Sequence, residues 1–281
     1  MEGRIVLVTG ATQGIGRETA LGLAKAGARV GIVGRDPKRT EDAAAYVKQG
    51  APGAIVDTFV SDLSVLAEVR ALGQTVCQTY TKLHVLVNNA GAIFMQREVT
   101  KDGLERTFAL NHLSYFLLTR ELLPLLTASA PARIVNVAST AHRRGTIDWD
   151  DLQSERGYSG FPVYGKSKLM NILFTRELAR RLDGTGVTAN CLHPGVINTG
   201  FGRNDKGWFG KLYKLGAPLL TSADKGARTT LHVAMSEEGG RVSGEYFNRS
   251  KVARPRAKAQ NDADAKRLWD VTEALLASKL K

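Results

Sequence analysis

A tyrosine and a lysine lie four residues apart in the segment Tyr164-Gly165-Lys166-Ser167-Lys168. On a helix, this spacing places both side chains on one face. A free tyrosine has a pKa near ~10, and a neighbouring ammonium favours the phenolate. We therefore expect Lys168 to bring the pKa of Tyr164 toward neutrality, so that the phenol can act as a general acid or base. Without further motifs, a tyrosine and a lysine at this spacing more often lie on a solvent-exposed helix face and have no catalytic role.

A serine hydroxyl follows an apolar run that ends in Val135-Asn136-Val137-Ala138-Ser139. Ligands of open α/β sheets bind beyond the carboxyl ends of the strands, which is where Ser139 is expected. There, its hydroxyl could orient a substrate carbonyl oxygen. The rival use of a serine, in a hydrolytic triad, is not supported because the sequence has no G-x-S-x-G elbow.

The first apolar run leads into a glycine-rich turn and then a helical pattern, in Thr9-Gly10-Ala11-Thr12-Gln13-Gly14-Ile15-Gly16. Gly10 permits a tight turn, Gly14 lets backbone approach a pyrophosphate, and Gly16 permits close packing of the helix on the strand. The helix N-terminus adds unpaired N–H groups and a partial positive charge. This context indicates a dinucleotide site and gives the Tyr–Lys pair a catalytic interpretation.

The second apolar run ends in Gly34-Arg35-Asp36. An acidic residue at this strand tip would bind the ribose 2′-OH of NAD, whereas arginine can pair with the 2′-phosphate of NADP. Arg35 and Arg39 therefore favour NADP over NAD, and Arg17 could assist. Asp36 lies one position after the strand tip, which Arg35 occupies, and is expected to cap the helix that begins at Pro37.

Short β-branched runs alternate with longer amphipathic stretches along the whole chain. Strands are expected at 4–9, 28–33, 54–60, 83–88, 132–138, 187–193 and 243–247. Helices are expected at 15–26, 37–49, 64–80, 101–128, 162–182 and 222–236. The alternation predicts one α/β domain over 1–281, a Rossmann-type, doubly wound parallel sheet of about seven strands with helices on both faces.

Two irregular regions interrupt this alternation, at 140–160 and 198–221. The second mixes glycines with aromatic residues, which suits a flap over an apolar ligand; the alternative is a surface excursion packed on the core. The stretch 259–281 is expected to form a C-terminal helix that docks on the core, with a membrane or partner surface as the alternative.

The composition points to an ordinary globular protein, with 43% hydrophobic and 23% charged residues. The net charge of +12 is scattered, so a solvated basic surface is expected and nucleic acid is not. No signal peptide or membrane span is recognisable, which predicts a cytoplasmic protein. Cys77 and Cys191 are expected to be buried thiols, and no metal site is expected.

Taken together, these motifs resemble the single-domain short-chain dehydrogenase/reductase superfamily over roughly residues 4–250. The resemblance implies a catalytic tetrad of Asn111, Ser139, Tyr164 and Lys168, in which Asn111 lies at a helix kink that holds a water for proton relay. It also implies cofactor contacts beyond the glycine turn, from Asp62, Leu63, Asn89, Ala90, Gly91, Tyr164, Lys168, Pro194, Gly195, Ile197 and Thr199.

Within the superfamily, the chain is most similar to retinol dehydrogenase-like and WW-domain oxidoreductase-like proteins. The segments Ala141-His142-Arg143 through Asp151-Leu152 and 173–182 carry this likeness, as does the 25-residue gap from Ser139 to Tyr164. The resemblance implies NADPH-dependent reduction of a bulky or apolar carbonyl, or the reverse oxidation, in a homodimer or homotetramer; a monomer stays open. Two other functions also stay open: a catalytically silent NADP-binding regulator and a reductase of activated C=C bonds.

Overall fold

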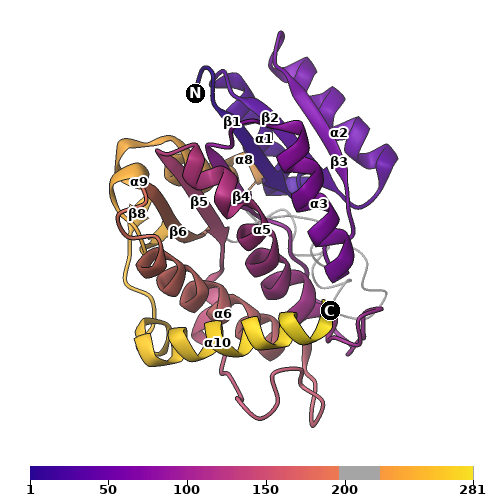
Figure 1. The fold of residues 1–281 in the computed structure, drawn as a ribbon, viewed down its shortest axis with the longest axis vertical. Coiled ribbons are helices and arrows are strands. Elements are labelled where there is room, and N and C mark those ends of the chain that lie inside the picture. Colours follow the sequence, from indigo (N-terminus) through magenta and orange to yellow (C-terminus); the bar gives the residue numbers. More distant parts are fainter. Residues whose placement is uncertain (196–221, 281) are drawn as a thin grey trace.

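The computed structural model describes residues 1–195 and 222–280, which form one eight-stranded sheet between two layers of helices (Figure 1). The strands lie in the order β3-β2-β1-β4-β5-β6-β7-β8. Neighbouring pairs are parallel except β7 and β8. The strand bounds are β1 Ile5–Thr9, β2 Arg29–Gly34, β3 Val56–Val60, β4 Val85–Asn88, β5 Ala132–Val137, β6 Val187–His193, β7 Tyr246–Asn248 and β8 Lys251–Val252.

The helices follow the strands in the expected alternation. Their bounds are α1 Gly14–Lys25, α2 Pro37–Gly50, α3 Leu66–Thr79, α4 Arg106–Phe108, α5 Ser114–Ala128, α6 Gly160–Arg181, α8 Ala223–Met235, α9 Glu237–Arg241 and α10 Asp262–Lys279. Among the described residues, three short helical turns differ from the α-helix. They are the π-helical turn η1 Ala109–Leu113 and the 3-10 turns η2 Thr140–Arg143 and η5 Ala257–Gln260.

Two apolar cores explain why the strands read as unbroken hydrophobic runs. In β1, Leu7 belongs to the core under α3, α5 and α6, whereas Val6 and Val8 belong to the core under α1 and α2. All three side chains are fully buried. A strand covered on both faces needs apolar residues at every position, because neither face meets water.

The C-terminal helix docks on the core, as predicted. Leu268 and Leu276 of α10 are buried, and Trp269 packs against Phe116 and Phe174. In Figure 1, α10 (yellow) lies across α6. None of the helices between residues 1–195 and 222–280 is long and apolar enough to cross a membrane.

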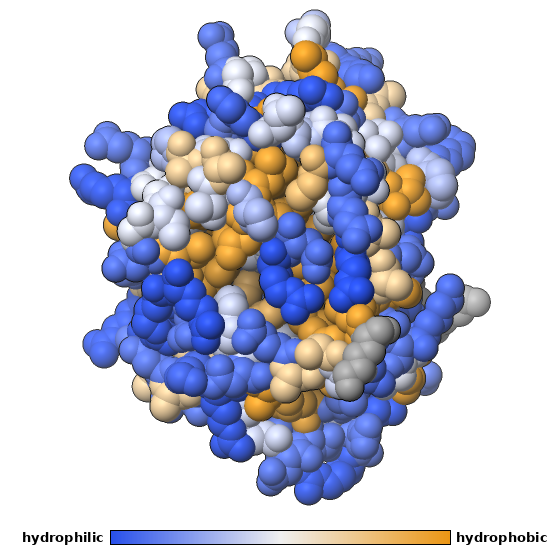
Figure 2. Space-filling model, viewed as in Figure 1, coloured by the Kyte–Doolittle hydropathy of each residue, from blue (hydrophilic) through white to orange (hydrophobic). Residues whose placement is uncertain are grey.

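The face that carries α5, α6 and α10 is covered mostly by hydrophilic side chains (Figure 2). Hydrophobic side chains are visible mainly toward the middle of this face. A polar and charged coat of this kind accords with the scattered positive charge of the sequence.

The structure corrects three expectations. The sheet gains a short antiparallel strand, β8. The helix expected at 101–128 begins only at Arg106, because Val99 pairs with Glu105 in a β-bridge and the Glu105 carboxylate caps Thr107 N–H and Phe108 N–H. Finally, Cys77 is exposed, whereas Cys191 is buried as expected.

Candidate active site

Seven parallel strands end at one edge of the sheet, and predicted site residues follow several of those ends. The register aligns Thr9 with Val33, Asn88 with Asn136, and Val137 with Leu192. Consequently the glycine turn after β1, the arginine after β2 and the serine after β5 share one rim, as the sequence predicted.

Ser139 lies directly at this rim. It is the N-cap of η2, and its Oγ accepts a hydrogen bond from Ala141 N–H at 3.2 Å. A second hydrogen bond joins its side chain to Tyr164. Ser139 and Tyr164, which are 25 positions apart in sequence, are therefore brought together as the sequence predicted.

Lys168 lies one turn further along α6 and is buried. Its Nζ is 5.6 Å from the centre of the Tyr164 ring and donates a hydrogen bond to Val137 O at 2.9 Å. The lysine is therefore fixed to the last residue of β5, two positions before Ser139. Serine, tyrosine and lysine form one cluster at the end of that strand.

Two glycines that the sequence analysis did not single out make this cluster possible. A Cβ on Gly165 would lie 2.8 Å from Ala141 O, and a Cβ on Gly145 would lie 2.2 Å from Gly165 O. Both distances are shorter than a real Cβ contact. The turn after β5 and the helix α6 thus approach backbone to backbone, and this contact sets Ser139 beside Tyr164.

The ionisation of the site differs from the prediction. Burial raises the pKa of Tyr164 to about 12, although the hydrogen bond with Ser139 lowers it. Burial also lowers the pKa of Lys168 to about 7. The prediction that Lys168 brings Tyr164 toward neutrality is wrong for the protein itself, because desolvation disfavours both charged forms. The group that titrates near neutrality is the lysine.

Asn111 lies within the π-helical turn η1 and is fully buried. Its Nδ2 donates to Ala92 O at 2.9 Å and to Ser167 Oγ at 3.0 Å, and its Oδ1 accepts from Ala92 N–H. The expected kink is therefore present as a π turn, a feature that is frequent at functional sites. Ser167, one residue before Lys168, was not predicted to take part.

The glycine turn has the shape that a dinucleotide requires. Gly10 and Gly14 have φ of 63° and 57°, a region that favours glycine. A Cβ on Gly16 would lie 2.4 Å from Gly10 O. The N-cap of α1, Gln13, forms no side-chain cap, and the first turn carries no acidic residue. The first N–H groups of α1 are thus left for an anion, so the residues fit a nucleotide pyrophosphate.

Asn89 ties the glycine turn to the neighbouring strand. Its Nδ2 donates to Thr9 O at 2.8 Å and to Gly10 O at 3.2 Å, while Thr9 Oγ1 accepts from Asn89 N–H and Ala90 N–H. Gly91 leaves room beside Asn111 and Lys168, since its Cβ would lie 3.4 Å from Lys168 Nζ. The segment 89–91 therefore links the glycine turn to the catalytic cluster.

The second strand tip presents two arginines beside the glycine turn. Arg35 is 63% exposed, with Nη1 4.0 Å from Asp62 Oδ2. Arg39 Nη2 donates to Gln13 Oε1 at 2.6 Å, and Asp36 caps α2 as predicted. Arg17, by contrast, lies over the Tyr46 ring and pairs with Glu18.

Asp62, at the rim after β3, forms a local turn in which its Oδ1 accepts from Ser64 N–H and Oγ–H. These bonds and Arg35 lower its pKa against the opposing effect of burial. Leu63, the next residue, is buried. Asp62 thus stays anionic close to Arg35.

Pro194 and Gly195 follow β6 at the same rim, and Gly195 has φ of 98°. The other two predicted contacts of this segment, Ile197 and Thr199, lie outside the described residues, as does the flap expected at 198–221.

Apolar side chains are exposed near the start of α6, three residues before Tyr164. Phe161, one turn earlier in α6, is 48% exposed, and Met95 is 37% exposed. A Cβ on Gly160 would lie 2.6 Å from Phe94 O, so the start of α6 lies against residues 94–95. This apolar rim, Phe94, Met95 and Phe161, was not predicted from the sequence.

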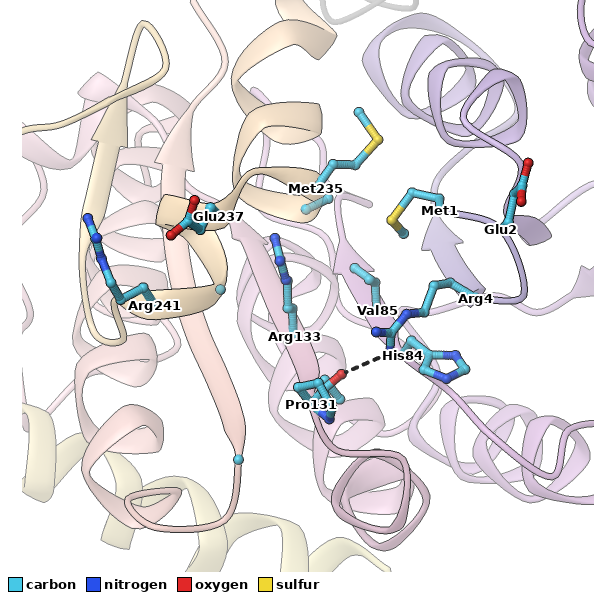
Figure 3. Close-up of a pocket in the computed structure, with 14 residues that line it drawn as sticks. Met1, Glu2, Arg4, His84, Val85, Pro131, Arg133, Met235, Glu237 and Arg241 are labelled. Atoms are coloured by element: carbon cyan, nitrogen blue, oxygen red, sulfur yellow. Dashed lines mark hydrogen bonds between the residues drawn. The ribbon is translucent and has the colours of Figure 1, made fainter.

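A cavity at the opposite edge of the sheet lies away from these residues (Figure 3). It is lined by residues at the amino ends of the strands, among them Arg4, His84 and Arg133. Among residues 1–195 and 222–280, no group of three His, Cys, Asp or Glu side chains could hold a metal ion.

The family model of the short chain dehydrogenases matches residues 4–208. This chain belongs to the short chain dehydrogenase family. It is an oxidoreductase of the alcohol–carbonyl type with a nicotinamide cofactor.

Retinol dehydrogenase 12 of Mus musculus is 44% identical, over 98% of this chain and 86% of its own length. Two solved structures also match. A putative uncharacterized protein from Mycobacterium Paratuberculosis has a TM-score of 0.79 and 32% identity, over 98% of this chain and 93% of its own. An RhlG/NADP active-site complex from Pseudomonas aeruginosa has a TM-score of 0.71 and 30% identity, over 88% of this chain and 95% of its own.

Proposed function

We propose that this dehydrogenase uses NADP(H) to interconvert a bulky, apolar carbonyl compound and its alcohol, with Tyr164 as the general acid and base. The observation that carries the proposal is the Ser139–Tyr164–Lys168 cluster at the carboxyl edge of the sheet. The similarity to retinol dehydrogenase 12 supports an apolar alcohol or aldehyde as substrate, as does the apolar rim around Phe161.

In the reduction, the Ser139 and Tyr164 hydroxyls hydrogen-bond the substrate carbonyl oxygen and hold it in place. The reduced nicotinamide supplies the hydride. With its pKa near 12, Tyr164 is a protonated phenol at neutral pH and can donate its proton to the developing alkoxide. Lys168, with a pKa near 7, is suited to replace that proton.

The direct test is NADPH oxidation by a panel of aldehydes, ketones, quinones and enones, including all-trans-retinal and short-chain aldehydes as controls. We expect turnover with bulky apolar carbonyls and an alcohol as product. NADPH binding without turnover on every compound would instead support the catalytically silent regulator. Reduction of the C=C bond of an enone, detected by product analysis, would support the other alternative.

Cofactor choice is expected to depend on Arg35. Arg35→Asp should raise KM for NADPH by about 10–100-fold, because a charged hydrogen bond to the 2′-phosphate contributes about 1.5–3 kcal/mol. KM for NADH should change little. Lys38→Asp is the matched control: Lys38 is exposed and pairs with Asp42, so it makes the same charge change nearby. If both variants raise KM for NADPH equally, Arg35 does not bind the 2′-phosphate.

Substrate size preference is expected to depend on Phe161. Phe161→Ala should raise KM for a bulky apolar aldehyde by about 3–30-fold, through loss of apolar contact, and leave a short aldehyde nearly unaffected. Ile55→Ala is a control at an exposed apolar residue just before β3, at the opposite edge of the sheet. An equal change for short and bulky aldehydes would contradict a role of Phe161 in size selection.

A further inference from the structure

We propose that His193 is a positioning residue for hydride transfer, which holds the peptide after Ser139 so that the serine hydroxyl meets Tyr164. The proposal rests on the catalytic role proposed above for Ser139 and Tyr164. It concerns a side chain that the reaction scheme leaves unused.

The peptide group between Ser139 and Thr140 is held at both of its polar atoms by histidine rings. His193 Nδ1 accepts from Thr140 N–H at 3.3 Å. His142 Nδ1 lies 2.6 Å from Ser139 O, the carbonyl of the same peptide. Because this plane is fixed on both sides, the backbone of Ser139 has little freedom to turn its hydroxyl away from Tyr164.

The hydrogen bonds determine the tautomers of both rings. His142 Nε2 accepts from Arg256 N–H at 3.4 Å, so its proton is on Nδ1, which donates to Ser139 O. His193 uses Nδ1 as an acceptor, so its proton is on Nε2. Each ring must be neutral to make these bonds.

The position of His193 explains why a side chain is needed there. The main-chain pairing of β5 with β6 ends at the bond from Ala138 N–H to Leu192 O, at 2.8 Å. Beyond it, the chain after β5 turns into η2, and Thr140 N–H finds no strand partner. The His193 ring, 7% exposed, supplies that acceptor at the last residue of β6.

The surroundings keep the ring in its accepting form. Burial, together with smaller contributions from His142, Arg143 and Arg249, lowers the pKa of His193 to about 4. Burial likewise lowers the pKa of His142, against the effect of Ser139 O, and the cations Arg143, Lys258 and Arg256 add to the lowering. At neutral pH both rings are therefore uncharged, and Nδ1 of His193 is free to accept.

The test compares three substitutions of His193. An asparagine places its Oδ1 near the position of Nδ1, a glutamine places its amide one methylene further, and a leucine offers no acceptor. We expect His193→Leu and His193→Gln to lower kcat by about 10–100-fold, because a displacement of about 1 Å in an active site costs about 10²-fold. His193→Asn should recover kcat to within about threefold of wild type, and KM for NADPH should stay nearly constant in all three.

His84 is the matched control. Its Nδ1 also accepts a backbone N–H, that of Ile5, at 2.9 Å, and the ring is 8% exposed. It lies at the opposite edge of the sheet, in the cavity of Figure 3. His84→Leu should cost a similar amount of thermal stability but leave kcat unchanged.

The outcomes are separable. Wild-type kcat in His193→Leu, or equal loss of kcat in the Asn and Gln variants, would overturn the proposal. An equal loss of kcat in His84→Leu would do so too. If His193→Leu does not fold, the comparison of Asn with Gln decides. Failure of the proposed function is distinguishable from these results, because it would appear as absence of carbonyl turnover in the wild type or as full activity of Tyr164→Phe.

Discussion

Tyr164→Phe is expected to lower kcat for carbonyl reduction by about 10²–10⁴-fold, the usual contribution of a positioned general acid. The phenylalanine ring occupies the same space, so the fold should be kept. The substitution removes the phenol hydroxyl, which is both the proton donor and the hydrogen-bond partner of Ser139. Steady-state kinetics with NADPH and a turned-over carbonyl, together with NADPH binding and thermal unfolding, would measure this.

Tyr115→Phe is the matched control. Tyr115 is buried, and Lys168 Nζ lies 5.6 Å from the centre of its ring. Its hydroxyl has no hydrogen-bond partner among residues 1–195 and 222–280. Removing this hydroxyl should leave kcat within about twofold of wild type, since the ring is kept. Full activity in a folded Tyr164→Phe variant would eliminate the phenol as the proton donor.

Lys168→Met is expected to make the protein more stable and nearly inactive. Burial lowers the pKa of Lys168 from 10.5 to about 7. Below pH 7, this shift lowers the free energy of unfolding of the wild type by about 5 kcal/mol at most. Methionine fills the space without a charge, although Val137 O loses its donor, at a cost of about 1 kcal/mol. We expect a gain of about 1–4 kcal/mol at pH 6 and a loss of about 10²–10³-fold in kcat.

The pH dependence of this gain identifies its cause. The unfolded lysine binds a proton up to about pH 10.5, whereas the folded one releases it near pH 7. Between these values the unfolded state binds more protons, so wild-type stability rises with pH. The advantage of Lys168→Met should therefore be largest below pH 7 and shrink as the pH approaches 10.5. Urea unfolding at several pH values would measure it. A gain that is constant with pH would show that packing, not charge burial, is responsible.

The sequence predicted most of the fold, because the apolar runs and glycine turns are local signals. Six strands and the helix start at Pro37 lie within two residues of their predicted places. The missing β8 has only two residues, both exposed, and offers no pattern to recognise. The helix expected from 101 could not be placed, because its true start depends on the cap formed by Glu105.

The site residues were predictable where a motif names them, and their ionisation was not. The pKa of Tyr164 and Lys168 depends on how much water the surrounding fold removes, which no spacing in the sequence reveals. The contact between Gly145 and Gly165 likewise depends on tertiary structure. His193 gave no signal, because a single histidine before a proline is compatible with many roles.

The contact between Gly145 and Gly165 also bears on how such a protein can change its preferences. At this contact main chain touches main chain, so no side chain lies between the two segments whose replacement could change their separation. The apolar rim of Phe94, Met95 and Phe161 consists of side chains, two of which are well exposed. Under the proposed function, exchanging rim residues would change substrate preference while the backbone contact between the two segments is retained.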